Sequence, residues 1–364
     1  MSSVFGQYLR LSLFGQSHGP AVGLTMDGLP AGMLIDTEAL ALALSRRAPG
    51  RSPLSTARQE TDEVEFLSGV LNGRTTGQPI CAVIRSAGMH SQDYGQGVDV
   101  LRPSHADYTG HVRYFGFEDW RGGGSFSGRL TAPLVACGAL CAQWLEARGV
   151  RIWAHIARLG DCRDEDIAAV EDTDRLAALK RKQLPVLSGA AEQAMEAAIL
   201  TARADGDSVG GVIACRVDGV PAGLGAPFFD SVESVLSHLL FSVPAVKGVS
   251  FGAGFDLAAL RGSQANDAFV IRDGQIRTET NRAGGINGGI TNGMPILVQC
   301  AFRPTPSIAK AQRTVSLKDM RETETEIHGR HDPCILPRAA VVVEAMCAIG
   351  LMELWKEREA CLKA

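Results

Sequence analysis

The feature that most constrains the fold is a pair of short motifs that occurs twice in the same order. The first motif, Asp-Gly-x-Pro-Ala-Gly, stands at 27–32 and again at 218–223. The second, Gly-x-Thr-x-Gly-x-Pro-Ile, stands at 73–80 and again at 289–296. Each motif is rich in residues that favour turns, so one of them alone could recur by chance. Chance would have to produce both recurrences in the same order. We therefore expect an internal duplication.

The sequence around these motifs predicts the secondary structure of each repeat. Each first motif follows a strand-like run and precedes a helix-like segment, at 36–47 and at 230–241. Each second motif leads into a β-rich apolar run. Further helices are expected at 129–148, 188–203 and 338–359.

No low-complexity linker divides the chain. Residues 1–364 are therefore expected to form a single α+β domain with two pseudo-symmetric repeats, at about 10–90 and 205–305, in which helices pack on mixed or antiparallel sheets. The charged segment 161–185 is expected to be a surface excursion.

Charge and cysteine usage exclude several classes of protein. The net charge of −4 gives no support to a nucleic-acid partner. No apolar run reaches membrane-spanning length, and the N-terminal residues lack the pattern of a signal peptide. The nine cysteines include no C-x-x-C pair and no histidine at zinc-finger spacing, so neither a disulfide framework nor a metal site is expected. We expect a soluble, cytoplasmic protein with reduced thiols and no membrane contact.

Glycine is in clear excess, at 41 of 364 residues, which indicates tight turns or close approach of the backbone to a ligand. Five segments combine glycine with histidine, arginine, serine or acid, at 15–19, 46–51, 102–110, 121–129 and 329–334. Two of them contain His18 and His105 in serine-rich or glycine-rich settings. Each alone can be a structural or turn residue, whereas together they favour acid-base chemistry near neutral pH.

Arginine and glycine in the same segments suggest an anion site. The glycines 122–124 precede a predicted helix, so they form either a tight turn or an anion cradle, and Ser127 and Arg129 favour the cradle. Arg46, Arg47 and Arg51 can be a solvated helix end or a clamp for phosphate and carboxylate.

Two more segments leave alternatives open. The run Arg330, His331, Asp332 is either a charged turn or an acid kept ionised by its neighbour. In the loop 302–308, prolines keep the backbone extended, and its hydroxyl groups either face a ligand or belong to a rigid edge.

Taken together, these segments resemble a known family. Between about residues 6 and 355 the chain contains, in order, GQSHG, RRAPG, SGVLNGRTTGQPI, HSQDY, RPSHADYT, RGGGSFSGR, GDSVGG, VPAGLG, PAVKG, NRAGGINGGITNG, RPTPSI and GRHDPC. This set is similar to the chorismate synthases. The resemblance implies a β-α-β sandwich, with a helical layer packed between antiparallel sheets, and a homotetramer.

The resemblance also implies a reaction and a cofactor. The family converts 5-enolpyruvylshikimate 3-phosphate to chorismate by 1,4-anti elimination of phosphate and a ring proton, the last common step of the shikimate pathway toward aromatic amino acids. It requires reduced FMN without net redox change. No G-x-G-x-x-G fingerprint follows a strand, so NADPH is expected to act only indirectly, through an external flavin reductase.

By resemblance, three residues receive roles in proton transfer. His18 corresponds to the general acid near the leaving phosphate, and His105 to the residue that protonates reduced flavin at N1. Asp332 corresponds to the acid beside flavin N5, which accepts the proton finally removed.

Other positions correspond to binding residues of the family. The substrate phosphate and carboxylates, or the flavin, would be received by Arg47, Arg129 and Arg330. FMN contacts would be made by Ser125, Phe126, Ser127, Ala245, Gly288, Arg303, Pro304, Thr305, Pro306, Ser307 and Arg330.

Four positions depart from the usual pattern of the family: Gln16 replaces glutamate, Pro53 and His90 replace arginines, and Ser125 is unusual. These changes concern anion affinity more than reaction type. Two other functions stay open, a flavin-binding paralogue that has lost the elimination and a non-enzymatic oligomeric scaffold. The first would bind FMN without turnover, and the second would bind none.

Overall fold

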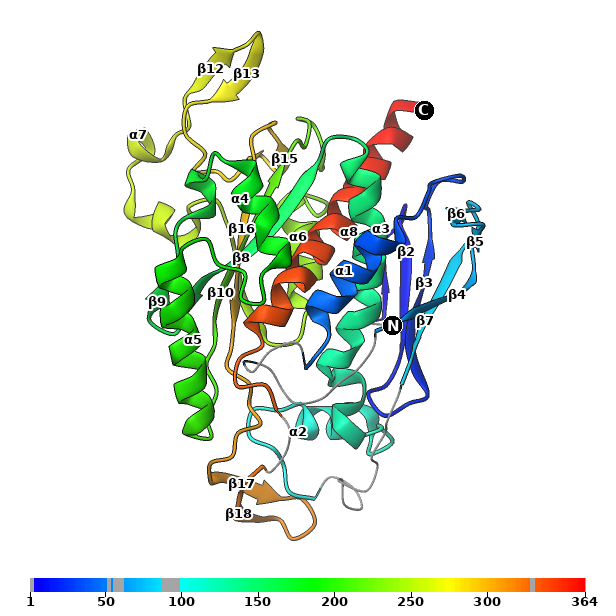
Figure 1. Cartoon of the computed structure of the whole chain (residues 1–364), viewed down its shortest axis with the longest axis vertical. Coiled ribbons are helices and arrows are strands. Elements are labelled where there is room, and N and C mark those ends of the chain that lie inside the picture. Colours follow the sequence, from blue (N-terminus) through cyan, green and yellow to red (C-terminus); the bar gives the residue numbers. More distant parts are fainter. Residues whose placement is uncertain (1–2, 51–53, 55–61, 87–98, 328–330, 364) are drawn as a thin grey trace.

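The computed structural model describes residues 3–50, 54, 62–86, 99–327 and 331–363 (Figure 1). Two antiparallel five-stranded sheets flank a central layer of helices. The predicted α+β class and the helical layer between antiparallel sheets are therefore confirmed.

The N-terminal and central parts of the chain each form one sheet. In spatial order the first contains β1 (Val4–Phe5), β2 (Arg10–Gly15), β3 (Ala21–Asp27), β7 (Ile80–Arg85) and β4 (Val64–Ser68). The second contains β11 (Val246–Phe251), β16 (Ile296–Phe302), β10 (Gly211–Asp218), β8 (Arg151–Leu159) and β9 (Cys162–Arg163). The order β2-β3-β7-β4 matches β8-β10-β16-β11, and the last pairing of each series contains a register shift.

The helical layer lies between the sheets. It consists of α1 (Thr37–Arg47), α3 (Thr131–Glu146), α6 (Val232–Phe241) and α8 (Leu336–Lys363). Helix α3 contacts the first sheet and α8 the second, and the two helices pack on each other. They approach closely because Gly138 faces Ala345, where an added Cβ would lie 2.3 Å from the alanine Cβ. A larger residue at 138 would separate the helices at the centre of the core.

The remaining elements surround this core. The other helices are α2 (Asp107–Tyr114), α4 (Thr173–Ala178), α5 (Gly189–Ala204) and α7 (Gly262–Ala265). Short hairpins are formed by β5 (Val70–Leu71) with β6 (Arg74–Thr75), β12 (Phe269–Arg272) with β13 (Gln275–Thr278), β14 (Ile286–Asn287) with β15 (Ile290–Thr291), and β17 (Gln312–Ser316) with β18 (Arg321–Thr325).

All five helices expected from the sequence are present. Three of them begin where a polar side chain accepts a hydrogen bond from the first turn, at Asp36, Ser188 and Ser231. The helix expected at 129–148 is shorter, because a separate 3₁₀ turn covers Gly128–Leu130 before α3 begins.

The segment 161–185 is more than the surface excursion expected from its charge. Its residues Ile167, Leu176 and Leu179 are buried against Trp153 of β8 and Ala214 of β10. These residues form a second small core on the outer face of the second sheet. The prediction considered the charged residues of the segment and overlooked its apolar residues, whose spacing suits short helices.

The two copies of the duplicated motifs make the same hydrogen bonds. The Thr75 hydroxyl donates to the Pro30 carbonyl at 2.6 Å and accepts from the Met33 amide at 3.0 Å. The Thr291 hydroxyl donates to the Pro221 carbonyl at 2.7 Å and accepts from the Leu224 amide at 2.9 Å. The duplication stays a prediction, which these matched contacts support.

We expect Thr75→Val and Thr291→Val to destabilise the protein to a similar degree. Each change keeps the shape but leaves a carbonyl and an amide of a partly buried turn without their partner, at a cost of about 1–3 kcal/mol. Denaturant unfolding measures the effect, with Thr76→Val at a neighbouring exposed position as control. A loss at one threonine and none at the other would contradict equivalent roles.

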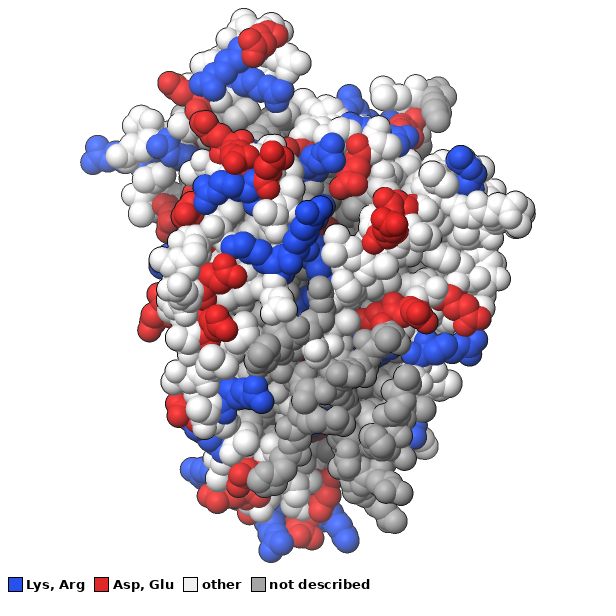
Figure 2. Space-filling model, in the orientation of Figure 1, with Lys and Arg blue, Asp and Glu red and all other residues white. Residues whose placement is uncertain are grey.

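The surface carries both charge signs. On the face shown in Figure 2, basic and acidic side chains are interspersed. Within the described ranges, no helix combines the length and apolar character needed to cross a bilayer.

Candidate active site

A cavity of about 1340 Å³ lies where several elements of the helical layer end. Its wall contains Arg47 at the end of α1 and the stretch 241–247, which links α6 to β11. The rest of the wall comes from the first turns of α8, the loop that follows β16 and the segment before α2. Residues far apart in sequence thus meet in one cavity.

His105 lies in this wall and is held by an ion-pair network. Its Nδ1 lies 2.6 Å from Oδ1 of Asp107, the first residue of α2. The Arg102 guanidinium donates two bonds to the same carboxylate, at 2.5 and 2.8 Å. Burial acts to raise the pKa of Asp107, but the hydrogen bonds from Arg102 and His105 outweigh it, and the pKa is well below the ordinary value. An ionised Asp107 keeps the proton of His105 on Nδ1, which leaves Nε2 for proton transfer.

The lowered pKa of Asp107 predicts a pH dependence of stability. A carboxyl whose pKa is lower in the folded protein stabilises it above the unfolded pKa, near 4, and this contribution is lost as the pH falls further. We expect the free energy of unfolding to drop less between pH 6 and pH 3 in Asp107→Asn than in wild type. Denaturant unfolding at both pH values tests this, and equal slopes would contradict it.

The glycines 122–124 hold both candidate histidines. All three have positive φ angles, of 58°, 84° and 51°. A Cβ on Gly122 would lie 2.0 Å from Cε1 of His18, and one on Gly123 would lie 3.4 Å from Nε2 of His105. The 3₁₀ turn Gly128–Leu130 separates these glycines from α3, so an anion cradle there stays a prediction. Gly122 lets the His18 ring approach the backbone closely.

His18 is buried behind this glycine run rather than exposed at the surface. Gly122 lines the cavity, whereas His18 is not among the described residues that do. The amide of Ser17 donates to the carbonyl of Gly124 at 3.0 Å and ties the His18 turn to the run.

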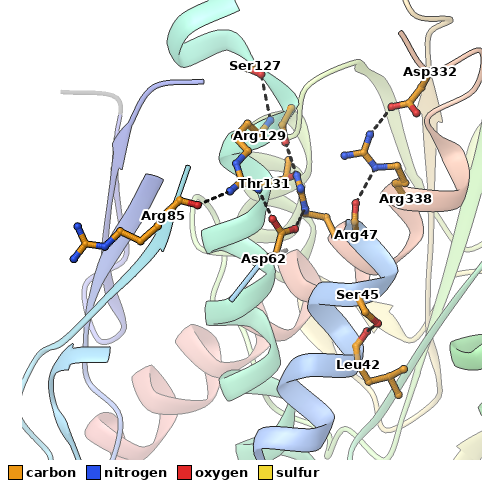
Figure 3. Close-up of polar contacts among 11 residues, drawn as sticks. Leu42, Ser45, Arg47, Asp62, Arg85, Ser127, Arg129, Thr131, Asp332 and Arg338 are labelled. Carbon is orange, nitrogen blue, oxygen red and sulfur yellow. Dashed lines mark hydrogen bonds and ion pairs between the residues drawn. The ribbon is translucent and has the colours of Figure 1, made fainter. Parts of the chain in front are cut away.

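A buried carboxylate joins the two arginines that the resemblance assigned to substrate binding (Figure 3). Asp62 Oδ2 accepts from Nε of Arg47 at 2.7 Å, and its Oδ1 accepts from Arg129. Burial is the main cause that lowers the pKa of Arg47, to about 10, with Asp62 opposing it. Arg46 also has a carboxylate partner, Glu344, at 2.5 Å. The solvated helix end that stayed open for Arg46 and Arg47 is therefore excluded.

Asp332 belongs to the same polar network. It accepts from Arg338, whose Nε donates to the carbonyl of Arg47 at 2.8 Å (Figure 3). Asp332 and Arg338 both line the cavity. Sequence reasoning missed Asp62, Asp107, Arg102 and Arg338 as members of the site. The spacing of Asp107, two residues after His105, could have indicated a pairing of the two side chains, but it was interpreted as a turn.

The loop after β16 forms another part of the wall. The amide of Arg303 donates to the carbonyl of Ala245 at 3.0 Å, and its guanidinium donates to the carbonyl of Ser104 at 2.7 Å. Among the described residues, the buried Thr305 hydroxyl has no hydrogen-bond partner. Besides Arg303 and Thr305, the expected cofactor-binding residues that line the cavity are Ser125, Phe126, Ser127, Ala245, Pro306 and Ser307.

Known proteins of one family match this chain over nearly its whole length. The family model described as chorismate synthase matches residues 9–355. The chorismate synthase of Korarchaeum cryptofilum is 45% identical over 352 residues, which are 96% of this chain and 96% of the relative. The chain belongs to the chorismate synthase family. The Thermococcus kodakarensis chorismate synthase is 44% identical over 98% of both chains.

The fold agrees with that of a solved family member. A crystal structure of chorismate synthase, 28% identical, covers 97% of this chain and is itself covered to 93%, with a TM-score of 0.76. The resemblance inferred from the twelve sequence segments is thereby confirmed.

Some residues that the chorismate synthase resemblance implied do not join the cavity. Gly288 follows β14, away from the described lining, and Pro304 stands between lining residues without being one of them. Arg51, Arg330, Pro53 and His90 lie outside the described residues. Gln16 is exposed on the turn before His18.

Proposed function

We propose that this chain converts 5-enolpyruvylshikimate 3-phosphate to chorismate and phosphate, as a carbon-oxygen lyase of aromatic amino acid biosynthesis. The observation that carries the proposal is the content of the cavity. The guanidinium groups of Arg47, Arg129 and Arg338 line the same cavity as His105, which is paired with the carboxylate of Asp107. This combination suits a polyanionic substrate that loses phosphate and a proton.

The cavity residues fit reduced FMN as the cofactor. The Thr305 hydroxyl, which has no partner among the described residues, would bond the flavin or its phosphate, with the Arg303 to Ser307 loop and Phe126 beside it. When bound, reduced FMN supplies the electron density that helps phosphate to leave. Gly288 and Pro304 are assigned to the cofactor by resemblance alone, because neither lines the described cavity.

Residues of this chain bind the substrate and transfer protons. Arg47 and Arg129 bind and orient the anionic groups of the substrate. His18 acts as general acid for the leaving phosphate, a role supported by its packing against Gly122, which lines the cavity. Asp107 fixes the tautomer of His105, which moves a proton at its Nε2. Asp332, aligned by Arg338, accepts the proton taken from the ring.

We also propose a homotetrameric assembly in the cytoplasm and dependence on an external flavin reductase that uses NADPH. Gel filtration with light scattering tests the assembly. Incubation of the purified chain with NADPH and FMN, without any reductase, tests the dependence. Flavin reduction above the uncatalysed rate would contradict it.

Titration with FMN separates the proposed function from its alternatives. A chorismate synthase binds FMN and, under anaerobic conditions with reduced flavin, releases phosphate from the substrate. A paralogue that has lost the elimination would bind FMN and release no phosphate above a heat-treated control. A non-enzymatic scaffold would bind no FMN.

A further inference from the structure

The carboxylate of Asp62 occupies an unusual place between two arginines of the cavity. Its side chain is 1% exposed, and it is 15 residues from Arg47 and 67 residues from Arg129 in the sequence. We propose that Asp62 is a positioning residue, which fixes Arg47 and Arg129 as a rigid receptor for the phosphate of the substrate. The inference rests on the proposed function and assigns a role to a residue that touches no ligand.

The contacts place Asp62 behind the arginines. Both arginines line the cavity, whereas Asp62 is absent from the described lining. Asp62 bonds Nε of Arg47, and Nη1 of the same guanidinium donates to the carbonyl of Gly128 at 3.3 Å. On Arg129, Nη1 bonds Asp62 and Nη2 donates to the carbonyl of Arg85 at 3.4 Å. Each guanidinium is thus held by a carboxylate and a main-chain oxygen, which fixes its plane (Figure 3).

Fixed guanidinium groups favour binding through a lower entropic cost. A long arginine side chain loses much rotational freedom when it closes on an anion, unless that freedom has already been lost in folding. Asp62 restricts the rotation of two arginine side chains before any ligand binds. The two arginines come from different segments, the end of α1 and the turn before α3.

The local charge balance remains positive with Asp62 in place. The guanidinium groups of Arg47, Arg129 and Arg338 are faced by two carboxylates, Asp62 and Asp332. Within this group of five side chains one cationic charge is therefore in excess, which favours a phosphate. Removal of the Asp62 charge would increase this excess.

Two roles for Asp62 consequently predict opposite results. If Asp62 only balances charge, the isosteric change Asp62→Asn strengthens anion binding, because an opposing charge is lost. If Asp62 positions the arginines, the same change weakens anion binding although the site becomes more positive.

Inorganic phosphate is a suitable probe, since its binding requires neither turnover nor flavin. We expect Asp62→Asn to weaken phosphate binding by about tenfold or more, measured from the rise of the unfolding temperature with phosphate concentration. With the full substrate, KM rises more than kcat falls. Unchanged or tighter phosphate binding would overturn the proposal.

Glu344→Gln is the matched control. Glu344 forms a similarly buried pair with Arg46, the neighbour of Arg47 on α1, and neither residue belongs to the described cavity lining. Loss of either buried carboxylate is expected to lower stability. Because Glu344 pairs with an arginine outside the described cavity lining, phosphate binding should stay within about twofold of wild type in Glu344→Gln. An equal loss in both variants would make Asp62 merely structural.

If Asp62→Asn does not fold, Asp62→Glu provides the same test. It retains the charge and shifts the carboxylate by one methylene group. A positioning role predicts weaker phosphate binding, and a charge-balancing role predicts no change. Failure of the proposed function would look different, since wild type would then bind phosphate without converting the substrate.

Discussion

Replacement of His105 by alanine is expected to reduce kcat by about 10²–10³-fold, the usual contribution of a general acid or base. His105 lies in the cavity wall, and Asp107 holds its Nδ1 at 2.6 Å so that Nε2 carries out the transfer. The affinity for FMN should change by less than about threefold, because the loop after β16 and Phe126 retain their positions. Stopped-flow turnover and a flavin fluorescence titration measure the two quantities.

His111→Ala is the control for this prediction. His111 lies on α2 and also pairs with a carboxylate, Glu118, at 3.2 Å, but it is only half-buried and lies outside the described cavity lining. Its replacement should leave kcat within about twofold. A fall in FMN affinity as large as the fall in kcat would mean that His105 binds the cofactor and does not transfer a proton.

The second large effect is expected for Gly122→Ala. The added Cβ would stand 2.0 Å from Cε1 and 2.1 Å from Nδ1 of His18, and the φ angle of 58° disfavours alanine by about 1–2 kcal/mol. The imidazole must leave its buried position, so the proposed general acid is displaced. We expect kcat to fall by about 10²-fold or more, as in the loss of an acid catalyst.

Gly189→Ala separates this effect from a general cost of replacing glycine. Gly189 is the first residue of α5, lies outside the described cavity lining and has no heavy atom within 4 Å of an added Cβ. We expect the Gly189 variant to retain the activity and thermal stability of wild type. A Gly122→Ala enzyme with full kcat would exclude His18 from proton transfer, since its ring could not occupy the position described here.

The fold could be predicted from the sequence where the pattern is local. Neighbouring residues alone indicate three features: the strands, the helix starts at Asp36 and Ser231, and the two copies of the duplicated motifs. The small core formed by 161–185 was missed because its apolar residues are scattered among charges.

The site could be predicted only in part. His18, His105 and Arg129 stand in recognisable glycine-rich segments, whereas Asp62 stands in a charged run and reaches partners 15 and 67 residues away. No spacing rule connects those positions, because the fold alone brings them together. The contact between Gly122 and the His18 ring could not be predicted either, because it joins two segments about one hundred residues apart.

The proposed reaction is an elimination that requires reduced flavin but consumes none. It can be tested by the amount of phosphate and chorismate formed per FMN in a sealed anaerobic reaction, with the flavin spectrum recorded throughout. We expect many equivalents of both products for each reduced FMN, which stays reduced at the end, and no product with oxidised FMN. One equivalent of product per flavin oxidised, or no phosphate above the heat-treated control, would contradict it.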